Sequence, residues 1–281
     1  MTGDFAELRP LLVAVAYELL GSVADAEDVV QDAWLRWREV DHDQVRDARA
    51  YLCRTVSRLA LNRLRTVSRR REDYVGPWLP EPLVAREDVA TQVADADAVS
   101  TAMLVVLESL GPVERVVFVL RDVFGFEYDE VAEVVQKAPE NVRQIAHRAR
   151  SHVQARRPRF AADRTAHRDA VDRFKLAAET GDVDLLLSLL APDVVLITDG
   201  GGAVKAALRP IVGREKVMRF LAGVLAGQDV AVDVADVNGR PGLVVRISGR
   251  LDTVASFDLE EGLATRLWVT RNPAKLAGLT S

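Results

Sequence analysis

The chain has 281 residues, of which 49% are hydrophobic and 28% charged, a composition typical of a folded protein with sizeable cores and two or three domains. Its net charge of −5 argues against non-specific nucleic-acid binding by the whole surface, but leaves room for local basic patches. The single cysteine, Cys53, excludes an intramolecular disulfide framework and is expected to be buried. Because there is no membrane-length apolar run and no signal-peptide pattern, we expect a cytoplasmic protein without a membrane partner.

The N-terminal part, residues 1–73, predicts helices only. Apolar residues recur at helical spacing from Leu8 to Leu19, Gly21 ends that helix, and Ser22 can cap the next one. The second helix holds DAEDVVQDAWLRW, and a third holds ARAYLCRTVSRLALNRLRTVSRRR. The pattern therefore indicates a compact three-helix domain.

Two of these helices carry charge on one side. On the second helix, Asp25, Asp28 and Asp32 form an acidic stripe, which either docks a basic partner or is simply a solvated face. The third helix ends in five arginines with no acidic residue before Glu72. This basic segment either binds nucleic acid or is simply a solvated helix end. The side-chain amide of Asn62, just before these arginines, is able to read a base. The arginines are Arg63, Arg65, Arg69, Arg70 and Arg71.

A linker over residues 74–98 opens with the segment YVGPWLPEP, residues 74–82, which we call the strap. Its prolines and glycine exclude a helix, and it is too apolar for an ordinary solvated linker. A spacer in polyproline conformation is one interpretation, and a preordered docking surface is the other.

Residues 99–158 predict a second all-helical domain with a helix-turn-helix. A helix EYDEVAEVV is followed by a short turn and by a helix that begins at Pro139, so the second helix could lie in the major groove of DNA. A plain helical hairpin with a basic face is the alternative. Gln136 stands where such turns usually carry glycine, which predicts a strained or differently shaped turn. The expected base-reading and phosphate-binding residues are Glu140, Asn141, Arg143, Gln144, His147 and Arg148, and Arg150 also suits phosphate.

Residues 165–281 alternate helices with short strands, which predicts an α+β domain with a mostly antiparallel sheet. Asp193, Asp199 and Asp233 are available as general bases, but there is no histidine beyond His167 and no recognisable acid–base pair. Asp199 precedes three glycines and is expected to cap a turn. Metal, P-loop and nucleophilic-triad patterns are absent from the sequence, so a regulatory domain is favoured over an enzyme.

Taken in order, the segments DAEDVVQDAWLRW, ARAYLCRTVSRLALNRLR and VRQIAHRARSHV resemble a bacterial sigma factor of the extracytoplasmic-function (ECF) type. The strap, together with DGGG and NPAKL in the last domain, resembles the group with a C-terminal SnoaL-like extension. The resemblance implies a region 2 helical bundle, a region 4 helix-turn-helix and a cone-shaped α+β domain with a pocket. Many relatives carry Arg-Asn where this chain has Ser57 and Arg58, which leaves Asn62 as the better base-reading candidate.

This resemblance also implies partners and roles. Core RNA polymerase and promoter DNA are the expected partners, and Asp28, Gln31 and Asp32 of this chain are expected to bind the polymerase. No cofactor, metal or catalytic residue is implied. A small ligand of the last domain is left open. The alternatives are a ligand-sensing helix-turn-helix repressor and a SnoaL-like enzyme fused to a DNA-binding module. The strap is expected to dock on the last domain through its own residues Tyr74, Trp78, Leu79 and Pro80. On the last domain, the expected contact residues are Asp199, Gly200, Gly201, Gly202, Asn272, Pro273, Lys275 and Leu276.

Overall fold

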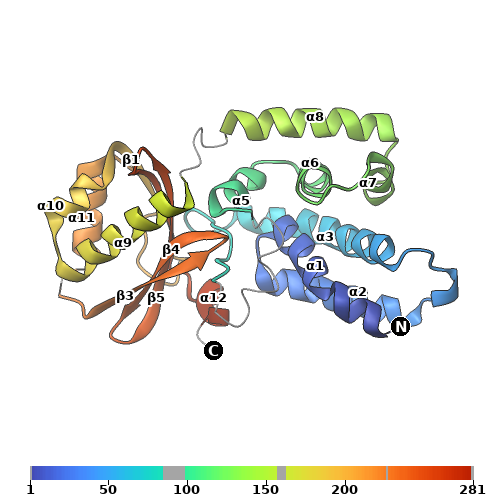
Figure 1. The fold of residues 1–281 in the computed structure, drawn as a ribbon, viewed down its shortest axis with the longest axis horizontal. Coiled ribbons are helices and arrows are strands. Elements are labelled where there is room, and N and C mark those ends of the chain that lie inside the picture. Colours follow the sequence, from blue (N-terminus) through green and yellow to red (C-terminus); the bar gives the residue numbers. More distant parts are fainter. Residues whose placement is uncertain (1, 85–98, 157–162, 226, 280–281) are drawn as a thin grey trace. The chain divides into compact units, whose positions relative to one another are not determined.

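The computed structural model describes residues 2–84, 99–156, 163–225 and 227–279 (Figure 1). The chain forms two compact units. The helical unit comprises Met1–Glu72, Glu87–Val99 and Met103–Arg157. The mixed unit comprises Asp73–Arg86, Ser100–Ala102 and Pro158–Ser281, so it contains the strap. Among the described residues, no helix is long and apolar enough to span a membrane.

The first half of the helical unit is the expected three-helix bundle. Its helices are α1 (Thr2–Leu20), α2 (Val23–Glu39) and α3 (Ala48–Glu72), with a short 3-10 turn η1 (His42–Gln44). Ser22 caps α2 as predicted, because its hydroxyl accepts a 3.2 Å hydrogen bond from the backbone of Asp25. Cys53 is fully buried, and burial raises the pKa of its thiol to about 11, so it serves as a small core side chain.

The second half contains the helix-turn-helix. Its elements are α5 (Thr101–Glu108), α6 (Pro112–Phe118), a π-helical turn η2 (Val119–Val123), α7 (Tyr128–Val135) and α8 (Pro139–Arg156). Helix α3 packs against α6 and α7. Arg54 forms an ion pair with Glu133, and Arg58 Nη2 donates a 2.7 Å hydrogen bond to the carbonyl oxygen of Glu133. These contacts join the two helical halves into one unit.

The turn between α7 and α8 is left-handed at Gln136, with φ 55° and ψ 51°. Its backbone N–H donates to the carbonyl of Ala132, as does that of Lys137 at 3.1 Å, which closes the helix end. The chain thus adopts the turn that glycine normally makes, at a conformational cost of about 1–2 kcal/mol for a residue with a side chain. The turn is therefore strained rather than differently shaped.

Replacing Gln136 with glycine is expected to raise the free energy of unfolding of the helical unit by about 1 kcal/mol. Glycine adopts a positive φ without steric penalty, and its larger freedom in the unfolded chain offsets only part of the gain. Urea denaturation of the two proteins measures the difference. Gln136→Ala is the control, because alanine keeps the left-handed penalty; an equal gain in both variants would mean that the glutamine side chain, not the backbone, is unfavourable.

As the sequence predicts, the mixed unit is an α+β domain with a mostly antiparallel sheet, which has six strands. The strand order is β2-β1-β6-β5-β4-β3, in which only β1 and β6 run parallel. The strands are β1 (Leu190–Asp199), β2 (Ile211–Val212), β3 (Val230–Val237), β4 (Arg240–Ile247), β5 (Arg250–Glu260) and β6 (Leu263–Thr270). The other elements are α9 (Arg164–Thr180), α10 (Val183–Ser188), α11 (Arg214–Leu225), α12 (Pro273–Leu276) and the 3-10 turn η3 (Ala277–Leu279).

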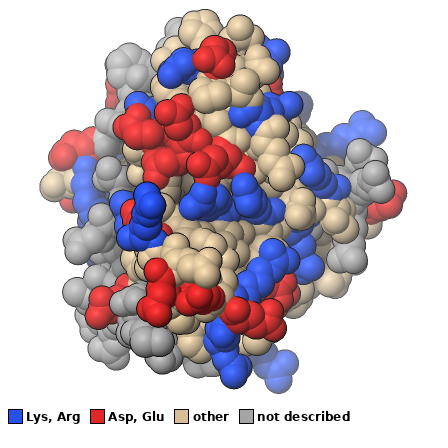
Figure 2. Space-filling model, turned by 90° about the vertical axis from the view of Figure 1, so that its right-hand side faces the viewer, with Lys and Arg blue, Asp and Glu red and all other residues tan. Residues whose placement is uncertain are grey.

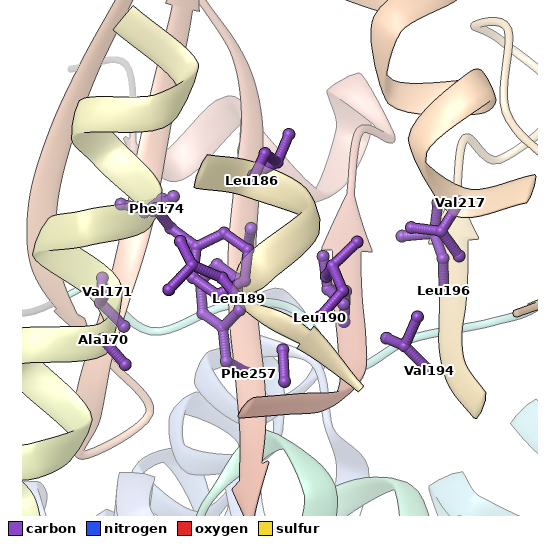
Figure 3. Close-up of a cluster of buried hydrophobic side chains, with 14 of the residues drawn as sticks. Ala170, Val171, Phe174, Leu186, Leu189, Leu190, Val194, Leu196, Val217 and Phe257 are labelled. Atoms are coloured by element: carbon purple, nitrogen blue, oxygen red, sulfur yellow. The ribbon is translucent and has the colours of Figure 1, made fainter. Parts of the chain in front are cut away.

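The two faces of this sheet bury different apolar clusters. On one face, helices α9, α10 and α11 supply Phe174, Leu186 and Val217 to a core that also contains Phe257 of β5 (Figure 3). On the other face, a smaller cluster joins β3, β4, β5 and α12, and Val84, just beyond the strap, packs against it. The linker also forms an antiparallel bridge between Val84 and Val237. This smaller cluster consists of Val237, Val244, Val254 and Leu276.

Candidate functional site

Helix α8 presents its predicted DNA-reading side chains to solvent. The apolar side of the helix is packed, with Val142, Ile145, Ala146 and Ala149 buried. A polar outer face on a firmly packed helix is what a recognition helix requires, because the inner face fixes its orientation while the outer face remains accessible. The exposed residues are Glu140, Asn141, Arg143, Gln144, His147 and Arg148.

Two arginines of α8, Arg143 and Arg150, have partners inside the helical unit. Arg143 remains exposed, but its guanidinium lies 5.4 Å from the ring centroid of Tyr128. Arg150 is more firmly engaged, since its Nε lies 2.6 Å from Asp122 Oδ1 and its Nη2 donates to the Tyr128 hydroxyl at 3.1 Å. Arg150 therefore fixes α8 within the helical unit, and a phosphate contact by this residue stays a prediction.

On α3, Asn62 and Arg65 are exposed, whereas Arg63 is bound to α2. Arg63 Nε donates a 2.9 Å hydrogen bond to Asp25 Oδ1, and Nη2 lies 3.5 Å from Asp28 Oδ2. The hydrogen bond to Asp25 raises the pKa of Arg63, which stays a cation. The structure thus gives Arg63 a role in joining α3 to α2. The side chains of the three last predicted arginines, Arg69, Arg70 and Arg71, lie outside the described residues.

The three residues of α2 expected to bind polymerase, Asp28, Gln31 and Asp32, are exposed. Asp28 and Gln31 also line a groove of about 520 Å³ between α1 and α2. The rings of Phe5 and Trp34 form part of its wall, with centroids 4.9 Å apart. An apolar wall beside carboxylates is suited to a partner that offers apolar and basic side chains together.

Charge is unevenly distributed on the surface. On the face shown in Figure 2, Lys and Arg side chains and Asp and Glu side chains gather in separate groups, with no single basic surface covering the face. This pattern agrees with the net charge of −5 and with the expectation that only local patches are basic.

The strap is held by one buried carboxylate, that of Asp199 at the end of β1. The Tyr74 hydroxyl donates to Asp199 Oδ1 at 2.6 Å, and the backbone N–H of Leu79 donates to Oδ2 at 2.9 Å. Lys275 Nζ lies 2.7 Å from the same Oδ2. Asp199 is 0% exposed, so these donors replace the water that a buried charge loses. It also caps a turn as predicted, since Gly201 N–H donates to it at 3.1 Å.

The ammonium group of Lys275 is enclosed by the strap. It donates to the carbonyl of Leu79 and lies 4.0 Å from the ring centroid of Trp78 and 5.2 Å from that of Tyr74. Its side chain is only 7% exposed. The aromatic residues of the strap therefore contribute cation–π attraction in addition to apolar contact.

Asn272 completes this cluster by binding on two sides. Its Oδ1 accepts from the backbone of Ala274 at 3.0 Å, which caps α12, and its Nδ2 donates to the Tyr74 hydroxyl at 2.7 Å. Burial, and then the hydrogen bond to Asp199, raises the pKa of Tyr74, so the phenol keeps the proton that it donates. Gly201 has φ 60°, and a Cβ atom there would collide with the Asn272 amide, so this loop position requires glycine.

The other predicted docking residues differ in burial. Leu79 is 1% exposed, whereas Trp78 is only partly buried. Leu79 is therefore the buried apolar anchor of the strap, and Trp78 acts as a partial cover over Lys275. Pro80, Gly200 and Leu276 are buried, while Gly202 and Pro273 are exposed.

The core of the mixed unit contains an apolar cavity of about 100 Å³. Its two charged lining residues bind one another: Arg271 Nε and Nη2 donate to Asp252 at 2.9 and 2.8 Å. Burial opposes ionisation, but the hydrogen bonds from Arg271 and Thr253 outweigh it and lower the pKa of Asp252. This carboxylate is thus a poor general base. Nothing in the sequence pattern pairs Asp252 with Arg271, whereas a pocket in this domain is what the SnoaL-like resemblance implies.

The carboxylates that the sequence offered as general bases do not line this cavity. Asp193 and Asp233 are exposed, and Asp199 binds Lys275 and the strap. Within the part of the chain that the structure describes, no cluster of His, Cys, Asp or Glu is able to hold a metal ion.

A packed three-helix bundle, a helix-turn-helix with an exposed polar face and an α+β domain together define a multidomain transcription factor. Residues 5–70 match the Sigma-70 region 2 family, and residues 100–153 match Sigma-70 region 4. The chain is 41% identical to the ECF RNA polymerase sigma factor SigJ of Mycobacterium tuberculosis, over 98% of this chain and 93% of that protein. It is 31% identical to the probable ECF sigma factor SigI of the same species, over 95% and 92%.

A solved structure agrees over the full length. The crystal structure of M. tuberculosis SigJ covers 99% of both chains with a TM-score of 0.80 and 37% identity. The chain belongs to the extracytoplasmic-function RNA polymerase sigma factors. The family expected from the sequence is thereby confirmed, and with it the order of two helical domains and an α+β domain.

Proposed function

We propose that this sigma factor reads the upstream promoter box with α8 and the downstream box with the exposed side of α3. The observation that supports this most strongly is the row of six exposed polar side chains on α8, set on a fully packed apolar face. Core RNA polymerase and promoter DNA are the partners that membership of the family implies. The protein supplies sequence specificity and strand opening, and the reaction belongs to the polymerase.

Upstream reading is divided between base recognition and positioning. Arg143→Ala is expected to change the preferred base at one position of the box, at about 1–3 kcal/mol, because Arg pairs bidentately with guanine. Arg148→Ala is expected to weaken all sequences alike and to flatten the salt dependence, because phosphate contacts carry no sequence information. A promoter-library selection at two salt concentrations measures both effects.

Each arginine serves as the control for the other in this selection. An unchanged base preference after substitution of Glu140, Asn141, Arg143 and Gln144 in turn would contradict the assignment of α8. Arg150→Ala provides a further comparison, because this residue binds Asp122 and should lower stability without changing base preference.

Downstream, we propose that Asn62 reads a base that has left the duplex and that Arg65, with Arg69, Arg70 and Arg71, binds the backbone. Arg63 holds α3 against α2 through Asp25, which orients Asn62 one residue away. Extruding a base costs a few kcal/mol, which contacts to the single strand must offset.

Asn62→Ala is therefore expected to impair open-complex formation more than initial binding of the holoenzyme to the promoter. Permanganate reactivity of the melted strand measures opening, and gel mobility measures binding. Arg36→Ala, an exposed substitution on α2, is the control for general loss of charge. Equal promoter opening by the wild type and Asn62→Ala would contradict the base-reading role.

For the polymerase, we propose docking on α2 through Asp28, Gln31 and Asp32, with the groove beside Trp34 receiving an apolar side chain of the partner. Two observations support this surface: the exposure of the three polar residues and the apolar wall next to them. Replacement of Asp28 or Asp32 by alanine should accordingly weaken the binding of this protein to core polymerase.

We further propose that the C-terminal domain regulates transcription through the strap and catalyses no reaction of its own. The only carboxylate that lines the cavity in its core is that of Asp252. This carboxylate is already paired with Arg271, which makes it a poor general base. An assay with purified core polymerase separates the alternatives. Promoter-dependent initiation supports the sigma factor, binding to duplex DNA alone supports a repressor, and turnover of a small substrate supports an enzyme.

A further inference from the structure

The ends of β1 and β6 connect the apolar cavity to the strap. Successive side chains of a strand point to opposite faces of a sheet. Thr198 of β1 accordingly lines the cavity, while the next residue, Asp199, binds Tyr74 of the strap. Directly after β6, Arg271 lines the cavity and Asn272 binds Tyr74 in the same way. The backbone N–H of Arg271 also donates to the carbonyl of Asp199 at 2.7 Å, which ties the two strand ends together.

The chemistry of the cavity indicates what it can hold. Its wall is almost entirely apolar, and among its few polar residues Asp252 and Arg271 satisfy each other. A charged ligand would be desolvated there without a partner, whereas an uncharged apolar one would lose nothing. Dry apolar cavities of about 150 Å³ bind single-ring molecules such as benzene, so a cavity of about 100 Å³ suits a molecule of this size or smaller. Four of the lining residues, Phe174, Leu186, Leu196 and Phe257, are labelled in Figure 3.

We propose that this cavity binds a small uncharged apolar molecule, and that its occupancy tightens the hold of the C-terminal domain on the strap. The ligand packs against Thr198 and the aliphatic part of Arg271, and so restrains the strand ends that carry Asp199 and Asn272. The inference deepens the proposed regulation and rests on it for the effect on transcription. Binding and coupling themselves are properties of the mixed unit and are measurable without polymerase.

Arg271 is the residue through which the effect passes. Its guanidinium is fixed by Asp252 on the cavity side and by the carbonyl of Lys205 at 2.7 Å, and its backbone lies between Asp199 and Asn272. A ligand that favours this arrangement favours strap docking, and by linkage a docked strap raises the affinity for the ligand by the same factor.

The test uses the full-length protein and benzene as the probe. Titration calorimetry measures binding, and hydrogen exchange measures protection of the Leu79 amide, which is bonded to Asp199. Saturating benzene is expected to slow exchange of this amide about five- to tenfold, within the usual range of coupling between sites. Ala255→Leu, which fills the cavity from β5, should abolish both effects. Ala231→Leu, an exposed position on β3, is the matched control and should retain both.

A second variant and a reciprocal measurement complete the experiment. If Ala255→Leu does not fold, Ala178→Val fills the cavity from α9 instead. Tyr74→Phe, which loosens the strap, should weaken benzene binding. The factor by which the affinity falls should be comparable to the factor by which exchange of the Leu79 amide accelerates in this variant. No binding of benzene to the wild type, or binding that leaves Leu79 exchange unchanged, overturns the proposal. Either result leaves promoter reading by α3 and α8 intact, so the two proposals fail separately.

Discussion

Asp199→Ala is expected to lower the free energy of unfolding of the mixed unit by about 3–5 kcal/mol and to release the strap. The substitution leaves the Lys275 ammonium buried without its counter-ion and removes the acceptor for Tyr74 and Leu79. Breaking a buried ion pair from one side has an effect of this size, because the remaining charge is uncompensated. Urea denaturation measures the loss, and protease cleavage between residues 74 and 82 reports strap release.

Asp193→Ala is the matched control, because this aspartate lies on the same strand but is exposed. The double variant Asp199→Leu with Lys275→Met should recover much of the stability, since an apolar pair removes both buried charges. Strap release should persist in the double variant, because Tyr74 still lacks its acceptor. Equal stability of Asp199→Ala and Asp193→Ala would show that the carboxylate is not what holds the strap.

The helical unit is expected to lose stability as the pH rises from about 5 to 8, because of Glu18 at the end of α1. Burial raises the pKa of Glu18 from 4.5 to about 8, despite a hydrogen bond from the backbone of Val99 and the nearby charge of Arg115. The folded state therefore holds the neutral acid while the unfolded chain ionises. The stabilisation is complete below the unfolded pKa of 4.5 and is lost as the pH passes through 8, at about 1.4 kcal/mol per unit.

Glu18→Gln should remove this dependence, since the amide cannot ionise and its oxygen still accepts from Val99. The variant and the wild type should match near pH 5, and the variant should be more stable by roughly 3–4 kcal/mol at pH 8. Arg115, which is buried and paired with Glu108, keeps its charge over this range. Denaturation curves at several pH values test the prediction, with the exposed Glu7→Gln on α1 as the control. Parallel curves for the wild type and Glu18→Gln would contradict it.

Helix periodicity and capping residues were sufficient to predict both helical domains. Apolar spacing identifies α1, α2 and α3, and Ser22 and Gly21 mark the boundary between the first two. The helix-turn-helix followed from Pro139 and the polar face of α8, which the structure confirms as exposed. These features are local, so the sequence carries them directly.

Contacts between distant residues could not be predicted in the same way. The acid that engages Arg63 lies 38 positions away, and the lysine that neutralises Asp199 lies 76 positions away. Electrostatic patterning along a helix shows that arginines gather, but not which of them are already paired. Arg63 and Arg150 were predicted to contact DNA, and the sequence did not show that each also has an internal partner, Asp25 and Asp122. The pairing of Asp252 with Arg271 at the cavity is likewise a contact that the sequence pattern does not show, while the cavity itself was implied only by the family resemblance.

The division of the chain into units has a topological consequence. Part of the linker belongs to the mixed unit, and so does everything from Pro158 onward, while Met103–Arg157 belongs to the helical unit. The mixed unit is therefore assembled from three separate stretches of the chain. Closing the loops between these stretches costs conformational entropy, which contacts inside the unit must offset. The bonds of Asp199 to Tyr74 and Leu79 make such a contact, because they join the earliest stretch to a domain built mostly of residues far later in the chain.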